Sequence, residues 1–270
     1  MRNHYVRSFF AVSAAAAALY LLPSTSPAQA PAGKGKAAAA PLDPPTGPIP
    51  RTADGKPKIA GVWQGGGVSL LGEAGAPPKV APQPIRVPRP PTDQLSYQPW
   101  AEEKRKPLTT NDDPTLFCLL PGVPRITGMP MPFEIVQTPD KVVILYEAFR
   151  GFRIIPIDDR LRHPDDVTPT WMGDSVGRWD GDTFVVDVVG FNDKTWLSGV
   201  GSIHTEDLHV VERWTINPDN TLTYAATVED PKALTKPWHT GNVLRRPEGV
   251  RVEEYECIEN NQDVAHMKGR

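Results

Sequence analysis

The stretch SVGRWDGDTFVVDVVGF, residues 175–191, carries the clearest structural signal in the sequence. Valine, phenylalanine and tryptophan lie on both sides of the triplet Asp180-Gly181-Asp182, whose composition is typical of a tight turn. Two runs of β-forming residues joined by such a turn predict a β-hairpin. The fold class then depends on whether neighbouring segments repeat this pattern.

Segments on both sides of this hairpin do repeat it. Residues 132–158 predict three strands, and residues 208–230 and 242–257 each predict a further hairpin. The breaks between these runs are rich in Pro, Gly, Asn and Asp, which favour turns. Hairpins at this regular spacing predict an antiparallel up-and-down meander, and closing it into a barrel would remove its exposed edges.

The run IAGVWQ places Gly61-Val62-Trp63 at the start of the first expected strand. A Gly-x-Trp triplet at this place resembles the local signature of lipocalin-like proteins, in which the tryptophan packs across the closed end of the barrel. We therefore expect a mostly β protein, folded as an antiparallel up-and-down (lipocalin-like) barrel or a strongly curved meander, with a long proline-rich N-terminal region and little helix. An open or double-layered sheet is the alternative.

Residues 1–28 have the composition of a signal peptide. Arg2 and Arg7 form a basic start, and the apolar stretch that follows is too short to span a bilayer comfortably. Ser26 and Ala28 supply small side chains at positions −3 and −1 of a cleavage site. We expect cleavage after Ala28 and a periplasmic or secreted protein with no later membrane span; an uncleaved N-terminal anchor is the alternative.

Composition divides the rest of the chain into a tether and one domain. Residues 29–57 are rich in Ala, Pro, Gly and Lys and lack apolar periodicity, which predicts a disordered tether. Residues 58–270 are long enough for a single β domain with its own core. Within this domain the irregular, proline-rich segment 76–132 is expected to wrap the barrel, apart from a short helix in YQPWAEEKRK, residues 97–106.

Charge and cysteine content limit the possible partners. The sequence has 29 basic and 32 acidic side chains, a formal net charge of −3, and no basic block interleaved with aromatic residues. A nucleic-acid partner is therefore not expected. In an oxidising compartment Cys118 and Cys257 either form one disulfide or remain two buried thiols, and two cysteines are too few for a structural zinc site.

The stretch GSIHTEDLHVVERWTI, residues 201–216, mixes charged and apolar residues on one expected strand. Alternation places Glu206 and the other even-numbered residues on one face, and His209 and the other odd-numbered residues on the opposite face. Neither face is cleanly apolar, as expected for a strand that lines a ligand cavity. His204 is expected at the mouth of this strand.

Histidine spacing argues against a metal site in the same stretch. His204 and His209 are five residues apart, so a strand directs them to opposite faces and a helix does not align them. A weaker metal-binding alternative combines His204, Glu206 and His239. We expect neither a metal nor any other cofactor.

A second group of polar residues surrounds Asp187, which lies within an apolar run. A carboxylate in such a strand needs an arginine, a hydroxyl or a ligand nearby, or a raised pKa. The interpretations are an ion pair with Arg153 or Arg213 across the barrel, or an acid/base group in the cavity. The loop GFNDKTWL, residues 190–197, is either a polar binding loop with Trp196 as its lid or an Asx-type turn that caps the strand.

Five longer segments are distinctive in combination: IAGVWQ, DDPTLFCLLPGVPR, PFEIVQTPDKVVILYEAFRGFRIIPID, HPDDVTPTWMGDSVGRWDGDTFVVDVVGFNDKTWL, and IHTEDLHVVERWT with EDPKALTKPW. They cover most of residues 60–240, and together they resemble a family of exported bacterial proteins described as a domain of unknown function. The resemblance implies export and a shared domain. It implies no catalytic residues.

No Ser/His/Asp elbow, phosphate loop or dinucleotide fingerprint occurs in the sequence. The first function hypothesis is therefore an exported protein that binds a small, largely apolar molecule in a barrel cavity. The second is a cofactor-independent isomerase, lyase or hydrolase that moves a proton, and the third is a structural envelope protein. The oligomeric state is left open.

The enzyme hypothesis requires its acid/base groups to converge on one pocket. The candidate catalytic residues are Asp187, His204, Glu206, Tyr146 and Arg153. The candidate ligand-binding residues are Trp196, Asn192, Asp193, Arg213, His209 and Trp214.

Overall fold

The structure is a computed structural model that describes residues 46–65, 90 and 92–259. The expected signal peptide with its cleavage site, the tether as far as residue 45 and the start of the proline-rich segment lie outside the described residues. Residues 51–57, which were assigned to the tether, form a turn closed by a bridge between Arg51 and Pro57. The guanidinium of Arg51 also lies 3.0 Å from the carboxylate of Asp182 on the barrel.

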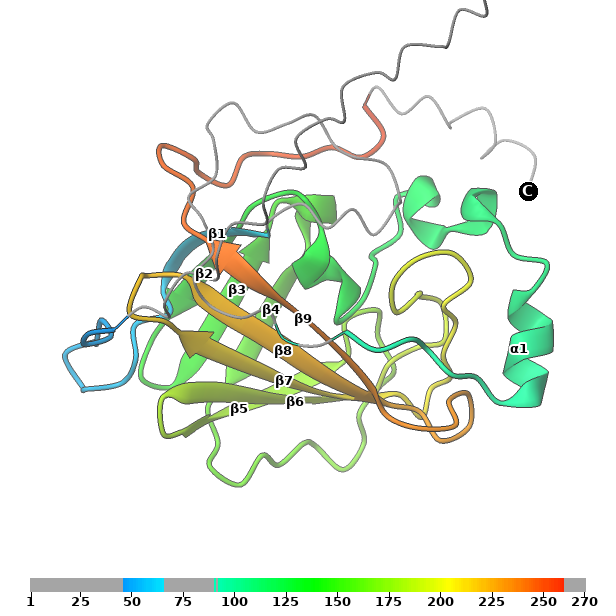
Figure 1. Ribbon diagram of the computed structural model, residues 1–270, viewed down its shortest axis with the longest axis horizontal. Helices are drawn as coiled ribbons and strands as arrows, with labels where there is room; N and C mark the ends of the chain where they lie inside the picture. The colour runs from blue at the N-terminus through cyan, green and yellow to red at the C-terminus, as the bar shows by residue number, and fades with distance from the viewer. Residues whose placement is uncertain (1–45, 66–89, 91, 260–270) are drawn as a thin grey trace, which may run out of the picture. The chain divides into compact units, whose positions relative to one another are not determined.

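Within the described residues, nine strands form one antiparallel sheet that curves into a nearly closed barrel, so the predicted fold class is confirmed (Figure 1). Because each strand pairs with the next along the chain in most places, the sheet is an up-and-down meander. The strands are β1 (Gly61–Gly65), β2 (Phe133–Gln137), β3 (Lys141–Tyr146), β4 (Phe152–Pro156), β5 (Asp174–Asp180), β6 (Thr183–Val189), β7 (His209–Ile216), β8 (Leu222–Glu229) and β9 (Trp238–Arg245).

The barrel closes in two different ways. Strand β9 returns to pair antiparallel with β1, so the sheet order is β4-β3-β2-β1-β9-β8-β7-β6-β5. An odd number of strands cannot alternate in direction all the way around, so β4 and β5 must meet in parallel. Among the described residues, the bridge at this junction joins Ile157 to Gly177 in parallel. Residues 157–173 supply the long connection that parallel neighbours require, and they run along the outside of β5 and β6 (Figure 1).

The tryptophan of the Gly-x-Trp triplet is part of the core. Trp63 is fully buried, its Nε1 donates to the carbonyl of Ile59 at 2.7 Å, and the guanidinium of Arg246 lies 4.0 Å from the centre of its ring. A Cβ at Gly61 would lie 2.0 Å from Nη1 of Arg246. Because Gly61 has no Cβ, the side chain of Arg246, which directly follows β9, can cover the ring of Trp63.

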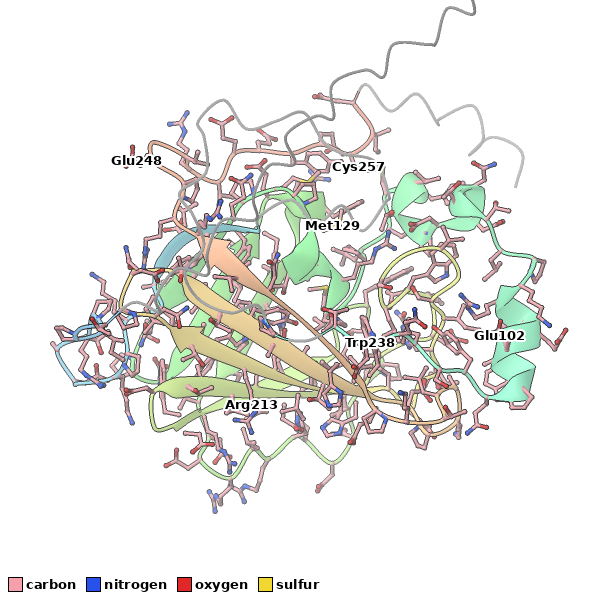
Figure 2. The ribbon with its side chains drawn as sticks, in the orientation of Figure 1. Glu102, Met129, Arg213, Trp238, Glu248 and Cys257 are labelled. Carbon is pink, nitrogen blue, oxygen red and sulfur yellow. A yellow bond between two sulfur atoms is a disulfide. The ribbon has the colours of Figure 1, made fainter. Side chains whose placement is uncertain are left out.

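Most of the predicted hairpins are confirmed, with one exception. The hairpin expected at 242–257 has only its first arm, in β9, because residues 251–256 form no strand. Cys257 therefore lies in a turn beyond the last strand, where it forms a disulfide with Cys118 (Figure 2). The Cα atoms of the two cysteines are 5.6 Å apart, so the disulfide alternative is the one realised.

The proline-rich segment contains the expected short helix, α1 (Pro99–Arg105), with proline in its first turn. Short 3₁₀ helices follow, and a buried ion pair between Arg125 and Asp113, 2.9 Å from Nη1 to Oδ1, holds this irregular region. No helix among the described residues is long and apolar enough to cross a membrane. The 3₁₀ helices are η1 (Thr110–Asp112), η2 (Pro114–Phe117), η3 (Arg125–Gly128) and, between β3 and β4, η4 (Ala148–Arg150).

Side chains alternate between the interior and the outer face along β7, as predicted. The even-numbered residues Glu212 and Trp214 are buried in the interior, whereas His209 and Arg213 lie on the outer face. The strand begins at His209, so Glu206 belongs to the preceding turn and is exposed. The interior is otherwise filled by apolar and aromatic side chains from eight of the strands, and the partly buried Trp179 of β5 packs against them.

Candidate functional site in the barrel interior

An ion pair between Arg153 on β4 and Glu212 on β7 lies at the centre of the interior. The Nη2 atom of Arg153 is 2.6 Å from Oε2 of Glu212, and the two side chains are 2% and 0% exposed. The same Nη2 donates to Oγ of Ser175 on β5 at 2.8 Å, and the hydroxyl of Tyr224 on β8 donates to Oε1 of Glu212 at 2.9 Å. Four strands therefore contribute to one buried polar network.

Local strand register explains how this network assembles. Tyr224 lies directly opposite Trp214, and the small Ala226 lies directly opposite Glu212. Because alanine leaves space beside the carboxylate, the longer side chain of Tyr224 can reach across the diagonal to it. Arg153 alternates with outward-facing neighbours on β4, so its long side chain points into the barrel.

Aromatic rings surround the network. The rings of Trp214 and Tyr224 have centroids 4.6 Å apart, and Phe133 contacts both Tyr146 at 5.3 Å and Trp214 at 6.1 Å. The hydroxyl of Tyr146 lies 3.3 Å from that of Thr127. The polar groups thus lie against large aromatic side chains in the packed interior of the barrel.

Three buried nitrogen atoms of this network make no well-directed hydrogen bond within the described part of the chain: Nε and Nη1 of Arg153 and Nε1 of Trp214. The hydroxyl of Tyr146 is a hydrogen-bonding neighbour of the same guanidinium. All three nitrogen atoms carry N–H groups and none can accept. Leaving a buried donor unpaired costs about 1–3 kcal/mol, so native interiors nearly always supply an acceptor from protein, water or ligand. These N–H groups can take an acceptor from water or from a bound molecule.

The charges of the network are already balanced. Burial alone lowers the pKa of Arg153, but the adjacent carboxylate of Glu212 outweighs it and raises that pKa above the ordinary value. Burial, followed by the charge of Glu212, raises the pKa of Tyr224, and burial is also the main cause of the raised pKa of Tyr146. Both phenols therefore stay protonated at neutral pH beside an arginine–carboxylate pair without net charge.

Asp187 does not belong to this interior network. The expected ion pair with Arg153 or Arg213 is wrong, because Asp187 occupies an outward position of β6 and contacts two histidines there. Its Oδ1 lies 2.8 Å from Nε2 of His209, and its Oδ2 lies 3.0 Å from Nε2 of His163. His163 comes from the 157–173 connection, so the carboxylate links that connection to β7.

The contacts of Asp187 extend into a chain of alternating carboxylates and imidazoles over the outer face of β5–β8. Nδ1 of His163 lies 2.6 Å from Asp174, and Nδ1 of His209 lies 3.6 Å from Glu229. In the strand register Asp187 is diagonal to Asp174 on β5 and to His209 on β7, and His209 lies directly opposite Glu229 on β8. Among the residues that the structure describes, no group of three or more His, Cys, Asp or Glu side chains could hold a metal ion.

Contacts within this carboxylate–histidine chain shift the pKa values of Asp187 and His209. Burial raises the pKa of Asp187, but hydrogen bonds from His209 and His163 outweigh burial and leave the pKa below its ordinary value. The hydrogen bond to Asp187 raises the pKa of His209. An ionised carboxylate between two imidazoles is an arrangement that can hold or pass a proton.

His204 lies at the mouth of β7 but is buried. Its Nδ1 lies 2.9 Å from the carbonyl oxygen of Thr205, which can only accept, so Nδ1 carries the proton. Burial lowers the pKa of His204 and keeps the ring neutral. Its Nε2 therefore accepts from the hydroxyl of Thr195 at 2.6 Å, an arrangement that ties the 190–197 loop to the strand.

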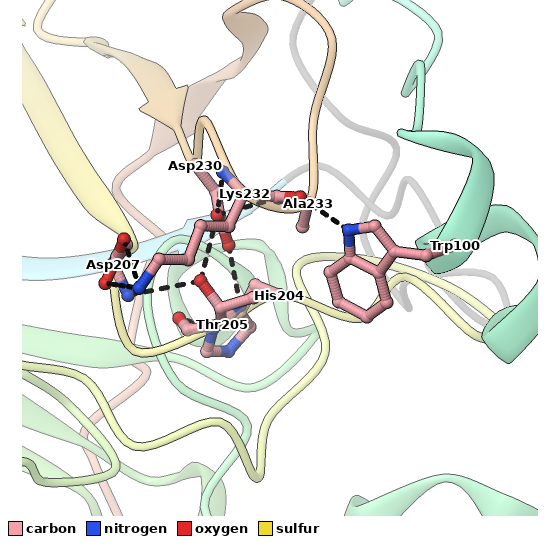
Figure 3. Close-up of polar contacts among 7 residues, drawn as sticks. All are labelled: Trp100, His204, Thr205, Asp207, Asp230, Lys232 and Ala233. Carbon is pink, nitrogen blue, oxygen red and sulfur yellow. Dashed lines mark hydrogen bonds and ion pairs between the residues drawn. The ribbon is translucent and has the colours of Figure 1, made fainter.

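A network centred on Asp230 joins the ends of β7 and β8 beside His204 (Figure 3). Asp230 accepts from the backbone N–H of Thr205 at 2.6 Å and from its hydroxyl at 2.9 Å. Nζ of Lys232 lies 2.9 Å from Oδ1 of Asp207, and the carbonyl of Lys232 accepts from Nε1 of Trp100 at 2.8 Å. These contacts attach α1 to the barrel, which is a structural role.

The residues that the enzyme hypothesis expected to converge lie in three places. Tyr146 and Arg153 are inside the barrel, Asp187 is on the outer face, and His204 is in the packed strand mouth. Among the described residues, these groups therefore do not form one pocket.

Of the predicted ligand-binding residues, Trp214 lines the barrel interior. Trp196 is buried in a small apolar cluster with Ala101 of α1, and Oδ1 of Asn192 accepts from the N–H of Lys194, as in the Asx-type turn that was the alternative. His209 is on the outer face, in the carboxylate–histidine chain. The exposed residues are Asp193, Glu206 and Arg213.

Glu212, Tyr224, Ser175 and His163 were not predicted as site residues. Glu212 had a usable signal, because it is an acid at an inward position between Val210 and Trp214 on the same face. His163 had none, since its partners are set by the path of an irregular connection.

Comparison of the chain with protein-family models, with curated proteins and with solved structures found no match in any of the three. The fold and the site together define a nearly closed antiparallel barrel with a buried ionic network among aromatic rings.

Proposed function

We propose that the protein binds a small, largely apolar molecule with at least one hydrogen-bond acceptor inside the barrel. The observation that carries this proposal is the set of buried N–H groups on Arg153 and Trp214 that make no well-directed hydrogen bond. A carbonyl, ether or hydroxyl oxygen of the ligand would accept from them. The rings of Phe133, Tyr146 and Tyr224 would contact its apolar body.

The charge balance of the network favours a neutral ligand. Glu212 already compensates the charge of Arg153 at 2.6 Å, so an additional anion would bring an uncompensated charge into a buried region. A neutral acceptor satisfies the free donors without that cost. We therefore expect a ligand such as a ketone, ester, amide or alcohol rather than a carboxylate.

We propose further that the protein acts in the periplasm or outside the cell. The disulfide between Cys118 and Cys257 supports this location, because disulfides persist in oxidising compartments. The signal peptide expected in residues 1–28 supports it independently.

Native mass spectrometry tests the binding proposal. The full chain is purified from its host without any step that would remove a bound small molecule. The expected result is a bound small molecule that organic extraction releases and identifies. Trp214→Phe removes one free N–H and keeps an aromatic ring, so it should lower the bound fraction at least several-fold. Trp100→Phe is the matched control, because Nε1 of Trp100 bonds a backbone carbonyl outside the barrel.

A second variant separates loss of binding from loss of folding. Arg153→Met with Glu212→Gln replaces the buried ion pair by neutral side chains of similar length, which proteins often tolerate. This double variant should fold, as judged by circular dichroism, and should carry no ligand. Retention of the same ligand by both variants, or a wild-type interior that binds only water, would refute the proposal.

Proton transfer at Asp187 is the second candidate function, because a partly exposed carboxylate contacts two imidazoles there. Hydrolysis and enolisation of a panel of esters, lactones and ketones would be compared between the wild type and Asp187→Asn. The control is Asp182→Asn, an exposed turn residue. Equal rates for all three proteins would eliminate this candidate.

A further inference from the structure

The outer face of β2, β3 and β4 carries an exposed apolar patch. Its large members are Val136, Leu145, Phe152 and Ile154, which are 41%, 40%, 61% and 56% exposed, and Val143 lies between them. We call these five residues the β2–β4 patch. Contiguous apolar surface of this kind on a soluble protein usually marks an interaction site.

Strand register makes the patch continuous. Val143 lies directly opposite both Val136 on β2 and Ile154 on β4, which forms a middle row across three strands. Leu145 and Phe152 lie opposite each other in the next row. By contrast, the outer face of β5–β8 is occupied by the carboxylate–histidine chain and the 157–173 connection.

Opposite charges lie at the two ends of the patch. Glu134 is in the row of Leu145 and Phe152, on one side of the middle row, and Lys141 is opposite Pro156 in the row on the other side. Each outer row is two residues, or about 7 Å, from the middle row along the strands. The nearest acid to Lys141 is its exposed neighbour Asp140 at 3.6 Å, a contact that leaves the ammonium available to another carboxylate.

We propose that the β2–β4 patch is the interface of a homodimer whose two-fold axis runs across the strands at the middle row. This rotation places the middle row against itself and exchanges the two outer rows. Glu134 of each copy then faces Lys141 of the other copy, and Phe152 faces Pro156. Stacked sheets lie about 10 Å apart and neighbouring strands about 4.8 Å apart, so the side chains of a lysine and a glutamate can meet.

The charge pattern favours a second copy over other occupants. One acid and one base placed symmetrically about an apolar centre are complementary to themselves, which a two-fold interface requires. An anionic membrane surface would instead be matched by several basic residues around the patch. The proposal is independent of any ligand in the interior.

Sedimentation velocity and light scattering on the full chain test the dimer. The wild type should sediment as a dimer, and Phe152→Lys should shift it to the monomer because a charge would replace the apolar ring that faces Pro156 of the other copy. Ile258→Lys is the control, since Ile258 is 60% exposed but lies in the turn after Cys257. Both substitutions are at exposed positions, so neither should impair folding.

Charge reversal tests the geometry of the interface. Glu134→Lys and Lys141→Glu should each weaken self-association about tenfold, because each homodimer would contain two like-charge contacts. An equimolar mixture of the two variants should restore wild-type association, since both contacts in the heterodimer are again between opposite charges.

Three outcomes would overturn the proposal. One is a wild-type protein that remains monomeric at every concentration at which it stays in solution. This outcome includes a monomer that binds lipid vesicles through Phe152. Another is a dimer that Phe152→Lys does not dissociate. The third is a mixture of the charge-reversed variants that associates no better than either variant alone, which would exclude this two-fold arrangement.

Discussion

Arg153 and Glu212 form an ion pair 2.6 Å apart across the interior, from strands β4 and β7, which are not neighbours in the sheet. Arg153 also bonds Ser175 on β5. Arg153 therefore bridges the junction between β4 and β5, where a parallel contact replaces the antiparallel ladder found elsewhere. A buried side-chain network reinforces the side of the barrel at which backbone pairing is weakest.

Removing one partner of this pair should be costly. Arg153→Ala leaves the carboxylate of Glu212 buried and unpaired, and we expect a loss of about 3–5 kcal/mol in the free energy of unfolding, measured in urea. Arg153→Met with Glu212→Leu removes both charges and should cost much less. A double variant as unstable as the single variant would show that the charge itself is not the cause.

A Cβ added at Gly61 should remove the guanidinium of Arg246 from the ring of Trp63. In Gly61→Ala the new Cβ displaces Arg246, which then loses its contact with the indole ring and its hydrogen bond to the carbonyl of Ala60. We expect about 1–2 kcal/mol less stability than in Gly47→Ala, by thermal or chemical unfolding. Gly47 has a φ of +134°, close to the +125° of Gly61, and nothing lies within 4 Å of a Cβ there, so the comparison isolates the contact.

The carboxylate–histidine chain should make stability depend on pH near neutrality, above the ordinary histidine pKa of about 6.5. Because the pKa of His209 is raised in the folded protein, its contribution is complete below the unfolded value of about 6.5 and is lost as pH rises through the folded pKa. Asp187 has a lowered pKa, so its contribution is present above the unfolded value and is lost as pH falls through the folded pKa. The contribution of His209 to stability should therefore increase from pH 8 to pH 6, whereas buried His204, with a lowered pKa, contributes in the opposite direction as pH falls.

His209→Gln isolates this effect, since glutamine can still donate to Asp187 but does not titrate. We expect the wild type to gain less than about 1 kcal/mol over the variant between pH 8 and pH 6, because His209 is partly exposed and solvent screens its charge. Urea unfolding at both pH values measures the difference. Parallel pH profiles for the two proteins would contradict the assignment.

The disulfide should contribute strongly to stability, because it joins residues 139 positions apart in the sequence. Replacing both Cys118 and Cys257 by serine should lower the free energy of unfolding by about 2–5 kcal/mol. Reduction of the wild type with dithiothreitol should give a similar loss and have no effect on the serine variant. An effect of the reductant on that variant would point to another cause.

Much of the fold was predictable because strand periodicity and turn chemistry are local properties. The strands of β2–β4 and both hairpins between β5 and β8 were predicted from alternation and from turns rich in Gly, Pro, Asn and Asp. The second strand of the hairpin expected at 242–257 was wrongly predicted for the same reason. Residues 251–256 have a β-like composition, but they form no strand. Pairing partners, unlike local pattern, depend on the whole chain.

The candidate site was less predictable. Tyr146, Arg153 and Trp214 were named from sequence, and the structure brings them into one interior region. Asp187 was assigned to the wrong partners, because strand alternation indicates which residues share a face but does not show whether that face points inward. Glu212 was not predicted as a site residue for the same reason, although the sequence had shown which residues share its face of the strand.

The sequence by itself determined a mostly β chain in hairpin order, with glycine, tryptophan and turn residues at the positions where such a chain needs them. Only the tertiary structure decided that nine strands close with one parallel junction, and which face of each strand is enclosed. The physical reason is that closure is a global condition: strand number, curvature and register together decide which charges are buried and must find partners. That condition pairs Arg153 with Glu212 inside the barrel and leaves Asp187 to the histidines outside.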